Sequence, residues 1–296
     1  MQAMLLAAGF GTRLRPYTFI RPKPLFPVLN RPLLLILLDM LHHSGFTRIV
    51  VNGHYLADQI ETAVAEVPDV RFQYEPEVLG IGGGLRRALP EFTDEPVLVM
   101  NGDTLHTIDL AALYDYHITS GNLVTLAMHD CPRFNTVLVK DERILTFQPD
   151  QNKAKSELLA FTGIQIVDPL IIRRIPDGRF YQSIDVYEDL ARRGEKIGIY
   201  RVDDCFWRDM GTPRDYLTLH EELLAGKIKL PFEFSSPGDR WLIDEQARLE
   251  AGVDLVDWGC IGNARVGRDA RLQRCVVWDG ASVAPGSRLK DAIVTP

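Results

Sequence analysis

The sequence predicts an α/β fold, with an open sheet flanked by helices and a short C-terminal left-handed β-helix. In the first 226 residues, short runs rich in Val, Ile and Leu alternate with stretches that have helical spacing. Several of the short runs are apolar at nearly every position, which is typical of parallel strands buried on both faces. From about residue 247 the apolar residues recur with a period of about six, which is typical of stacked coils. We therefore expect one domain at residues 1–228, a linker at 229–246 and the coils at 247–296.

Strands and helices alternate along the first of these domains. The expected strands lie at residues 3–8, 48–52, 70–74, 96–103, 122–128, 163–167 and 196–202, and the expected helices at 32–45, 56–67, 110–117, 183–194 and 213–226. Pro32 and Gly45 stand where proline and glycine usually begin and end a helix. Ligands of open α/β sheets bind at the carboxyl ends of strands. We therefore expect the turn from Gly9 to Thr12 and Asp103, which both follow strands, to face one crevice.

The tail is expected to form hexapeptide coils. The inward apolar positions are Val266, Leu272, Val277, Val283 and Leu289, the small companions are Ala264, Ala270, Ala281 and Ala292, and the corners are Gly262, Gly267, Gly280 and Gly286. One interval in this series is five rather than six, and an irregular β appendage is the other interpretation. An open coil end leaves unpaired backbone groups and apolar surface. We therefore expect the tail to pack on the rest of the chain or on a second copy, which would give a homo-oligomer.

Composition excludes several classes of function. The chain of 296 residues has 46% hydrophobic content, a net charge of -7 and a pI near 5.5. An acidic chain is poorly suited to nucleic acid, which is bound by clustered Lys and Arg. The four cysteines show no C-x-x-C spacing, and no run has the length of a signal or membrane segment. We expect a cytoplasmic protein with no nucleic-acid or membrane partner.

Basic residues nevertheless gather before the first carboxylate, Asp39, and this local charge suggests a small anion. They are Arg13, Arg15, Arg21, Lys23 and Arg31. Gly9 and Gly11 allow close approach of backbone amides to a phosphate, and Thr12 adds a hydroxyl. The segment GFGTRL lacks the third glycine of a dinucleotide-binding turn and the Lys-Ser or Lys-Thr pair of a P-loop. A bare G-x-G is also compatible with a purely structural turn.

The longer segment LAAGFGTRLRPYTFIRPKPLFPV, residues 6–28, resembles the sugar-1-phosphate nucleotidyltransferases. Further along, YEPEVLGIGGGLRRAL resembles the base-binding segment of that family, VLVMNGD its metal-binding strand end and FWRDMGTPRDYL its second metal segment. The resemblance covers residues 1 to 226. It implies a Rossmann-like open mixed sheet and an enzyme that joins a nucleoside triphosphate (NTP) to a sugar 1-phosphate and releases pyrophosphate.

The resemblance also implies roles for individual residues. Arg13 would bind the triphosphate and the leaving pyrophosphate, since a guanidinium offers a planar fork to phosphate oxygens. Lys23, held between two prolines, would place a point charge near the α-phosphate. Asp103 and Asp209 would hold Mg²⁺, a hard ion that takes one or two carboxylates together with substrate phosphate oxygens.

The remaining site residues follow from the same resemblance. The nucleotide site would be lined by Leu6, Ala8, Gly9, Gly11, Thr12, Arg13, Glu75, Gly80, Gly82 and Gly83. A carboxylate at Glu75 suits the ring N–H of guanine, uracil or thymine better than adenine. Gly163 would give backbone access to the sugar. The lysine of the family's F-x-E-K-P motif is missing, because Gln148 precedes Pro149, and Lys153 or Lys155 could replace it.

Two other functions are less consistent with the sequence. A regulatory or scaffold subunit with the same fold could lose the metal carboxylates or Lys23, but all are present. An acetyltransferase tail lacks a general base, since all seven histidines lie at or before His220. Within the family, the chain resembles the mannose-1-phosphate guanylyltransferases and muramate 1-phosphate uridylyltransferases. The latter typically lack a β-helical tail, so GTP with mannose 1-phosphate is slightly favoured, with UTP and dTTP open.

Overall fold

A computed structural model describes residues 1–148, 157–228 and 240–296, and these divide into two units. The first unit comprises Met1–Phe10, Leu38–Gly102 and Ile108–Trp207, and the second Gly11–Leu37, Asp103–Thr107 and Arg208–Pro296. Two early segments of the chain thus cluster with the C-terminal residues, and the expected domain bounds stay a prediction. Most of the expected linker at 229–246 lies outside the described residues.

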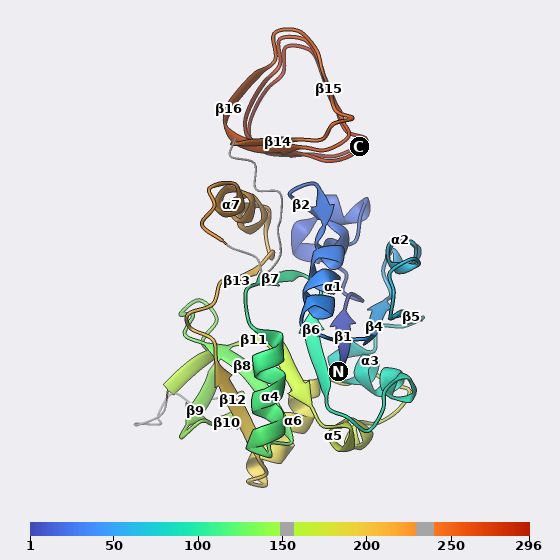
Figure 1. The fold of residues 1–296 in the computed structure, drawn as a ribbon, viewed down its shortest axis with the longest axis vertical. Coiled ribbons are helices and arrows are strands. Elements are labelled where there is room, and N and C mark those ends of the chain that lie inside the picture. Colours follow the sequence, from blue (N-terminus) through green and yellow to red (C-terminus); the bar gives the residue numbers. More distant parts are fainter. Residues whose placement is uncertain (149–156, 229–239) are drawn as a thin grey trace. The chain divides into compact units, whose positions relative to one another are not determined.

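A mixed sheet of nine strands forms the centre of the first unit, in the order β5-β4-β1-β6-β11-β8-β12-β10-β9 (Figure 1). The strands are β1 (Gln2–Leu6), β4 (Arg48–Gly53), β5 (Val70–Tyr74), β6 (Val97–Asn101), β8 (Val124–His129), β9 (Val137–Lys140), β10 (Arg143–Thr146), β11 (Glu157–Val167) and β12 (Ile197–Arg201). Strands β5, β4, β1 and β6 are parallel to one another, whereas β11 runs antiparallel to β6 and β8. Leu6 pairs with Asn101, so the carboxyl ends of β1 and β6 lie together. The mixed α/β sheet implied by the sequence is confirmed.

Helices cover both faces of this sheet. On one face, α3 (Gly80–Ala88), α5 (Pro169–Arg174) and α6 (Ser183–Arg192) contribute to the same buried core as Val124 and Leu126 of β8. On the other face, His117 of α4 (Leu110–Ser120) forms a hydrogen bond through Nδ1 with Thr125 Oγ1, at 2.9 Å. Because adjacent residues of a strand point to opposite faces, α4 lies opposite α3, α5 and α6. The other helices are α1 (Leu33–His43), α2 (Ala57–Val64) and α7 (Pro213–Leu224).

Helix α3 was not predicted, because it begins in the glycine run at residues 80–84. Glycine disfavours helix interiors by about 1 kcal/mol relative to alanine. Here the small residues are needed for packing: a Cβ on Gly83 would lie 2.7 Å from the carbonyl oxygen of Arg179. Close contact with the 179–183 segment therefore accounts for glycines in a helix.

The non-coil part of the second unit is built from short elements. These are the 3-10 turns η1 (Thr12–Leu14), η2 (Tyr17–Phe19) and η3 (Lys23–Leu25), the hairpin of β2 (Pro27–Val28) and β3 (Arg31–Pro32), and the pair β7 (Thr104–His106) and β13 (Trp207–Asp209). Helix α7 begins as expected, with Pro213 at its first position and the Thr212 side chain accepting a hydrogen bond from Asp215 N.

The tail forms two parallel sheets, seen as stacked coils in Figure 1. One contains β14 (Trp241–Ile243), β16 (Asp254–Ile261), β18 (Arg271–Val277) and β20 (Arg288–Val294), and the other β15 (Arg248–Leu249), β17 (Arg265–Val266) and β19 (Ser282–Val283). Val266 pairs with Val283, so one coil spans 17 residues. The three intervals between the inward residues of one coil must add up to 17 residues. Two intervals of six therefore leave one of five, which is the interval from Leu272 to Val277. The inward positions Val266, Leu272, Val277 and Val283 are buried in one core.

None of the helices within residues 1–148, 157–228 and 240–296 combines the length and apolar character of a membrane span.

Candidate active site

Lys23 occupies an unusual position for a lysine, because it is only 6% exposed. It begins the turn η3, with Pro22 before it and Pro24 after it. Proline fixes its own φ and restricts the residue before it. The amide of Phe26 donates to the carbonyl oxygen of Lys23 at 3.1 Å and closes the turn. The sequence therefore holds the backbone of Lys23 in a defined conformation.

The Lys23 ammonium group lies between two carboxylates. Its Nζ is 2.6 Å from Asp103 Oδ2 and 2.8 Å from Asp209 Oδ1. Arg13 Nη2 lies 3.3 Å from the other oxygen of Asp209, and its side chain is 62% exposed. These four residues, the predicted catalytic and metal positions, thus form one cluster within the second unit. Arg13 presents most of its side chain to solvent, where an anionic ligand has access.

Two glycines, Gly11 and Gly211, allow the side chains of this cluster to pack closely against the backbone. Gly11 has a left-handed φ of 60°, and a Cβ there would lie 2.8 Å from Thr18 Cγ2 and 3.3 Å from Lys23 Cβ. Gly211 was not predicted as a site residue, yet a Cβ there would lie 2.6 Å from Asp209 Oδ2 and 2.7 Å from Arg13 Nη1. In the sequence, Gly211 could have been suspected as a site residue from its position two residues after Asp209. Thr12, next to Gly11, is exposed.

The first unit carries the other predicted nucleotide residues. Leu6 and Ala8 are half-buried at the end of β1, and Gly9 is exposed, with no atom within 4 Å of the place where a Cβ would lie. Between them, the amide of Ala7 donates to Asn52 Oδ1 at 2.7 Å. The chain after β1 therefore leaves open space at Gly9, as a close approach to a phosphate requires.

Glu75, which the resemblance implied as a base contact, is buried in the first unit. Its side chain is 1% exposed, and Oε1 accepts hydrogen bonds from Asn52 Nδ2 at 2.7 Å and Gln73 Nε2 at 3.4 Å. The other oxygen, Oε2, accepts from the amide of Leu79 at 3.4 Å. These partners engage both oxygens inside the protein, and the base contact of Glu75 stays a prediction. Asn52, which sequence reasoning missed, is its principal partner.

The predicted glycines of the base segment pack against the protein itself. A Cβ on Gly80 would lie 2.7 Å from the carbonyl oxygen of Tyr181, and one on Gly82 would lie 3.0 Å from the same atom. Gly83 meets Arg179 in the same way. These contacts require glycine whether or not a nucleotide is bound.

Gly163 lies in β11 with a left-handed φ of 81°, where the pairing with β8 shifts register. A Cβ at this position would collide with the side-chain amide of Asn101. On the sugar side, Gln148 is exposed, while Lys153 and Lys155 lie outside the described residues. The replacement for the missing motif lysine therefore stays a prediction.

No group of three or more His, Cys, Asp or Glu side chains is arranged to hold a metal in the part of the chain that the structure describes. Asp103 and Asp209 are a pair, and both already face one cation, the Lys23 ammonium. A pair of carboxylates around a cation fits Mg²⁺, which completes its shell with water and phosphate oxygens.

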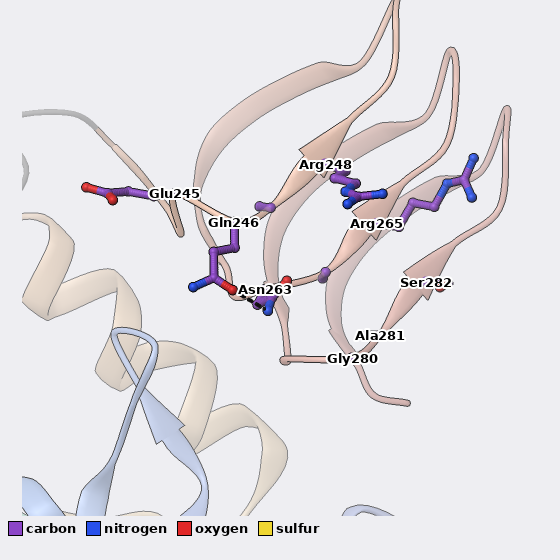
Figure 2. A pocket seen from close by; sticks show the side chains of 10 residues that line it. Glu245, Gln246, Arg248, Asn263, Arg265, Gly280, Ala281 and Ser282 are labelled. Atoms are coloured by element: carbon purple, nitrogen blue, oxygen red, sulfur yellow. Dashed lines mark hydrogen bonds between the residues drawn. The ribbon is translucent and has the colours of Figure 1, made fainter.

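An open pocket of about 700 Å³ lies on the coils (Figure 2). None of the residues that line it was predicted as a catalytic, metal or substrate residue. Its lining repeats with the coil step: Gln246, Asn263 and Gly280 occupy one register, and Arg248, Arg265 and Ser282 another. Asn263 Nδ2 donates to Gln246 Oε1 at 3.0 Å, and Arg265 is paired with Glu250. The pocket thus follows from regular stacking.

Comparison with known proteins identifies the family of the chain. The Nucleotidyl transferase family model matches residues 2–226. A UTP–glucose-1-phosphate uridylyltransferase of Synechocystis is 30% identical, over 99% of this chain and 87% of the relative. A mannose-1-phosphate guanylyltransferase of Mycobacterium tuberculosis is also 30% identical, over 97% and 82%. The crystal structure of HddC from Yersinia pseudotuberculosis with GMP-PN has the same fold, with a TM-score of 0.61 at 24% identity over 75% of this chain and 98% of that one. The chain therefore belongs to the nucleotidyl transferase family and is an enzyme of its sugar-1-phosphate nucleotidyltransferase group.

Proposed function

We propose that the chain transfers a nucleotidyl group from GTP to mannose 1-phosphate in the presence of Mg²⁺, with UTP and dTTP as the alternative donors. The observation that carries this proposal is the convergence of Arg13, Lys23, Asp103 and Asp209 in one cluster. The cluster brings together two cationic side chains and a pair of carboxylates, which suits a reaction between two phosphate groups.

The reaction joins two anions. An oxygen of the sugar phosphate attacks the α-phosphorus of the NTP, the bond from that phosphorus to the α,β-bridging oxygen breaks, and pyrophosphate leaves with the electron pair. The protein forms no covalent bond and acts by positioning and by neutralising charge. This requirement explains why basic residues gather in an acidic chain.

Lys23 and Arg13 divide this task. An ammonium group has three N–H donors, and the carboxylates of Asp103 and Asp209 engage two of them. The third is left for an oxygen of the α-phosphate. Arg13, which is mostly exposed, binds the β- and γ-phosphates and then the leaving pyrophosphate through its planar fork.

Asp103 and Asp209 would hold the metal. When bound there, Mg²⁺ would supply Lewis-acid polarisation of the α-phosphoryl group. The carboxylates also keep the Lys23 ammonium in place, since each accepts a hydrogen bond from it.

The choice of substrates rests on the relatives. The Mycobacterium enzyme is named for GTP and mannose 1-phosphate, and a relative from Aneurinibacillus thermoaerophilus, 28% identical, for a guanylyl transfer to a heptose 1-phosphate. The Synechocystis relative is named for UTP and glucose 1-phosphate. The choice does not rest on Glu75, because its carboxylate is engaged inside the protein.

The tail is proposed to be a left-handed β-helix of hexapeptide repeats. The 17-residue step between β18 and β20 and between β17 and β19, the inward Val and Leu positions and the parallel pairing support this assignment. Its outer surface is the proposed contact for a second copy of the chain.

A substrate matrix tests the proposal. Pyrophosphate release is measured with Mg²⁺ for GTP, UTP, dTTP, CTP and ATP against mannose, glucose, N-acetylglucosamine and muramate 1-phosphates. We expect the highest kcat/KM for GTP with mannose 1-phosphate, and its loss in Asp103→Asn. Asp109→Asn is the matched control, because Asp109 caps α4 by accepting from Ala112 N at 2.9 Å. A preferred pair other than GTP with mannose 1-phosphate would replace the proposed substrates, and activity that survives in Asp103→Asn would remove the metal role.

A further inference from the structure

We propose that Trp278, in the C-terminal coils, is a positioning residue for Lys23. The proposal rests on the proposed function, since it assumes that Lys23 acts on a phosphate. It gives the tail a part in the reaction, although no group of the tail would touch a substrate. All residues involved belong to the second unit.

The indole of Trp278 is enclosed by the segment that carries Lys23. It is 1% exposed, although it follows the last residue of β18. The Phe26 ring packs edge-on against it, with centroids 4.7 Å apart and an interplanar angle of 66°. The guanidinium of Arg21 lies 4.9 Å from the centre of the indole. Arg21 precedes Lys23 by two residues and Phe26 follows it by three, so the contacts bracket the lysine.

Hydrogen bonds tie the same segment to Trp278 through α7. Trp278 Nε1 donates to the hydroxyl of Tyr216 at 3.1 Å, and that hydroxyl donates to the carbonyl oxygen of Pro27. A second bond from the coils reaches the hairpin, since Asn30 Nδ2 donates to the carbonyl oxygen of Ile261 at 2.9 Å. The backbone from Pro27 to Asn30 is therefore fixed by groups of the tail and of α7.

The helix that carries Tyr216 also follows one of the carboxylates. Asp209 lies four residues before Pro213, the first residue of α7. Trp278 therefore contacts two supports of the cluster, namely the segment that holds Lys23 and the helix that begins just after Asp209. Through these two contacts the indole keeps the spacing between the Lys23 ammonium group and the Asp209 carboxylate defined.

The flanking prolines fix the local conformation of the Lys23 turn but not its place relative to Asp103 and Asp209. Because a lysine side chain has four rotatable bonds, the position of its ammonium group depends on where that turn is held. A displacement of about 1 Å at a reacting group can cost about 10²-fold in rate. Removal of the indole should therefore leave the Lys23 charge present but poorly placed.

Three variants test the inference in the full-length chain. Trp278→Leu removes the ring and the N–H, and Trp278→Phe retains a ring but no donor. Trp241→Leu is the matched control, because Trp241 packs within the coil core and against Gly259 rather than against the Lys23 segment. Steady-state kinetics with the preferred substrate pair are measured together with hydrogen exchange of the amides of Leu25, Phe26 and Leu29.

We expect Trp278→Leu to lower kcat by about 10- to 100-fold with less than about a threefold change in KM for the NTP, and Trp278→Phe to recover part of the rate. The three amides should exchange faster in Trp278→Leu and remain as in the wild type in Trp241→Leu. In a Lys23→Met background, Trp278→Leu should cause no further loss, because both changes act on the same group.

The outcomes separate this inference from the proposed function. A wild type active on some pair, with Trp278→Leu equally active and equally protected, overturns the positioning role and leaves the function intact. Equal losses in Trp278→Leu and Trp241→Leu would also overturn it, since the effect would then be general loss of the tail. A wild type inactive on every pair removes the proposed function, whereas faster exchange confined to Trp278→Leu would still support the link to the Lys23 segment.

Discussion

Asn52 donates a hydrogen bond of 2.7 Å from Nδ2 to Oε1 of Glu75, while its own Oδ1 accepts from the amide of Ala7 at 2.7 Å. A carboxylate that the sequence suggested for base recognition is thus part of an internal chain of hydrogen bonds. This chain links the end of β1 to the loop before α3.

We expect Glu75→Gln to lower the stability of the protein without changing its preference between GTP and UTP. The amide places an NH₂ group where a buried carboxylate oxygen accepted, which should lower the free energy of unfolding by about 1–3 kcal/mol. KM should rise by a similar factor for GTP and UTP. Denaturant unfolding and kinetics with both nucleotides check this, with the exposed Glu77→Gln as control. A change in the GTP to UTP preference in Glu75→Gln would instead favour direct contact with the base.

Lys23→Met should remove the cation between the two carboxylates while keeping the aliphatic volume. We expect kcat to fall by about 10²- to 10³-fold, the usual cost of losing one donor to a developing charge. Arg15→Met is the control for general charge, because Arg15 is an exposed residue of the same segment whose guanidinium lies 5.2 Å from the centre of the Phe19 ring. Similar losses in both variants would mean that the segment only attracts anions.

Gly9→Ala should affect nucleotide binding, whereas Gly11→Ala should affect the stability of the fold. A Cβ at Gly9 meets no protein atom within 4 Å, so the free energy of unfolding should change by less than about 0.5 kcal/mol, while KM for the NTP rises about tenfold. Gly11 has a left-handed φ and a Cβ position 2.8 Å from Thr18, so its substitution should cost about 1–2 kcal/mol of stability. Unfolding curves and nucleotide titrations of both variants measure this, and an unchanged KM in Gly9→Ala would exclude a phosphate approach there.

The residues discussed above differ in how well they could be predicted from the sequence. Apolar runs identified β1, β4, β6 and β8, because burial on both faces leaves a local pattern. Lys23 and the two aspartates could be proposed from the resemblance, since each lies in a recognisable segment. The role of Glu75 could not be predicted in this way, because its partner Asn52 lies 23 residues away and only the pairing of β4 with β5 brings them together.

The stability of the protein should decrease in acid, partly through His220. Burial lowers the pKa of His220 from 6.5 to about 4, so the folded state keeps it neutral. The unfolded chain binds this proton as the pH falls below 6.5, so the stabilisation is complete above pH 6.5 and is lost down to about pH 4. Burial also lowers the pKa of His117 to about 4, which adds to the effect.

His220→Gln isolates this contribution. The imidazole Nε2 accepts from the amide of Leu29 at 3.3 Å, so the ring is neutral with its proton on Nδ1, which faces the carbonyl oxygen of Tyr216. Between about pH 6 and 4.5 the variant should lose stability less steeply, by about 1.4 kcal/mol per pH unit, which corresponds to one proton. Unfolding curves at several pH values measure this slope, and equal slopes in the two proteins would assign the acid response to other groups.

Arg274 occupies a column of left-handed residues in the coils, with Asp257 and Asp291 one coil to either side. Its guanidinium contacts Asp291 at 2.5 Å and Asp257 at 2.8 Å. We expect Arg274→Ala to lower the melting temperature by roughly 2–4 °C, and Arg274→Gly by less, because glycine accepts the left-handed backbone. Thermal melts at low and high salt test this, and a lower melting point for the glycine variant would contradict the backbone explanation.

The 17-residue step also constrains how this tail can change during evolution. Inserting or deleting a whole coil would add or remove one layer and leave the inward residues and the left-handed column in phase. A single-residue insertion would instead turn the following apolar side chains outward. Homologues should therefore differ in tail length by whole layers, with the layer that carries Trp278 retained.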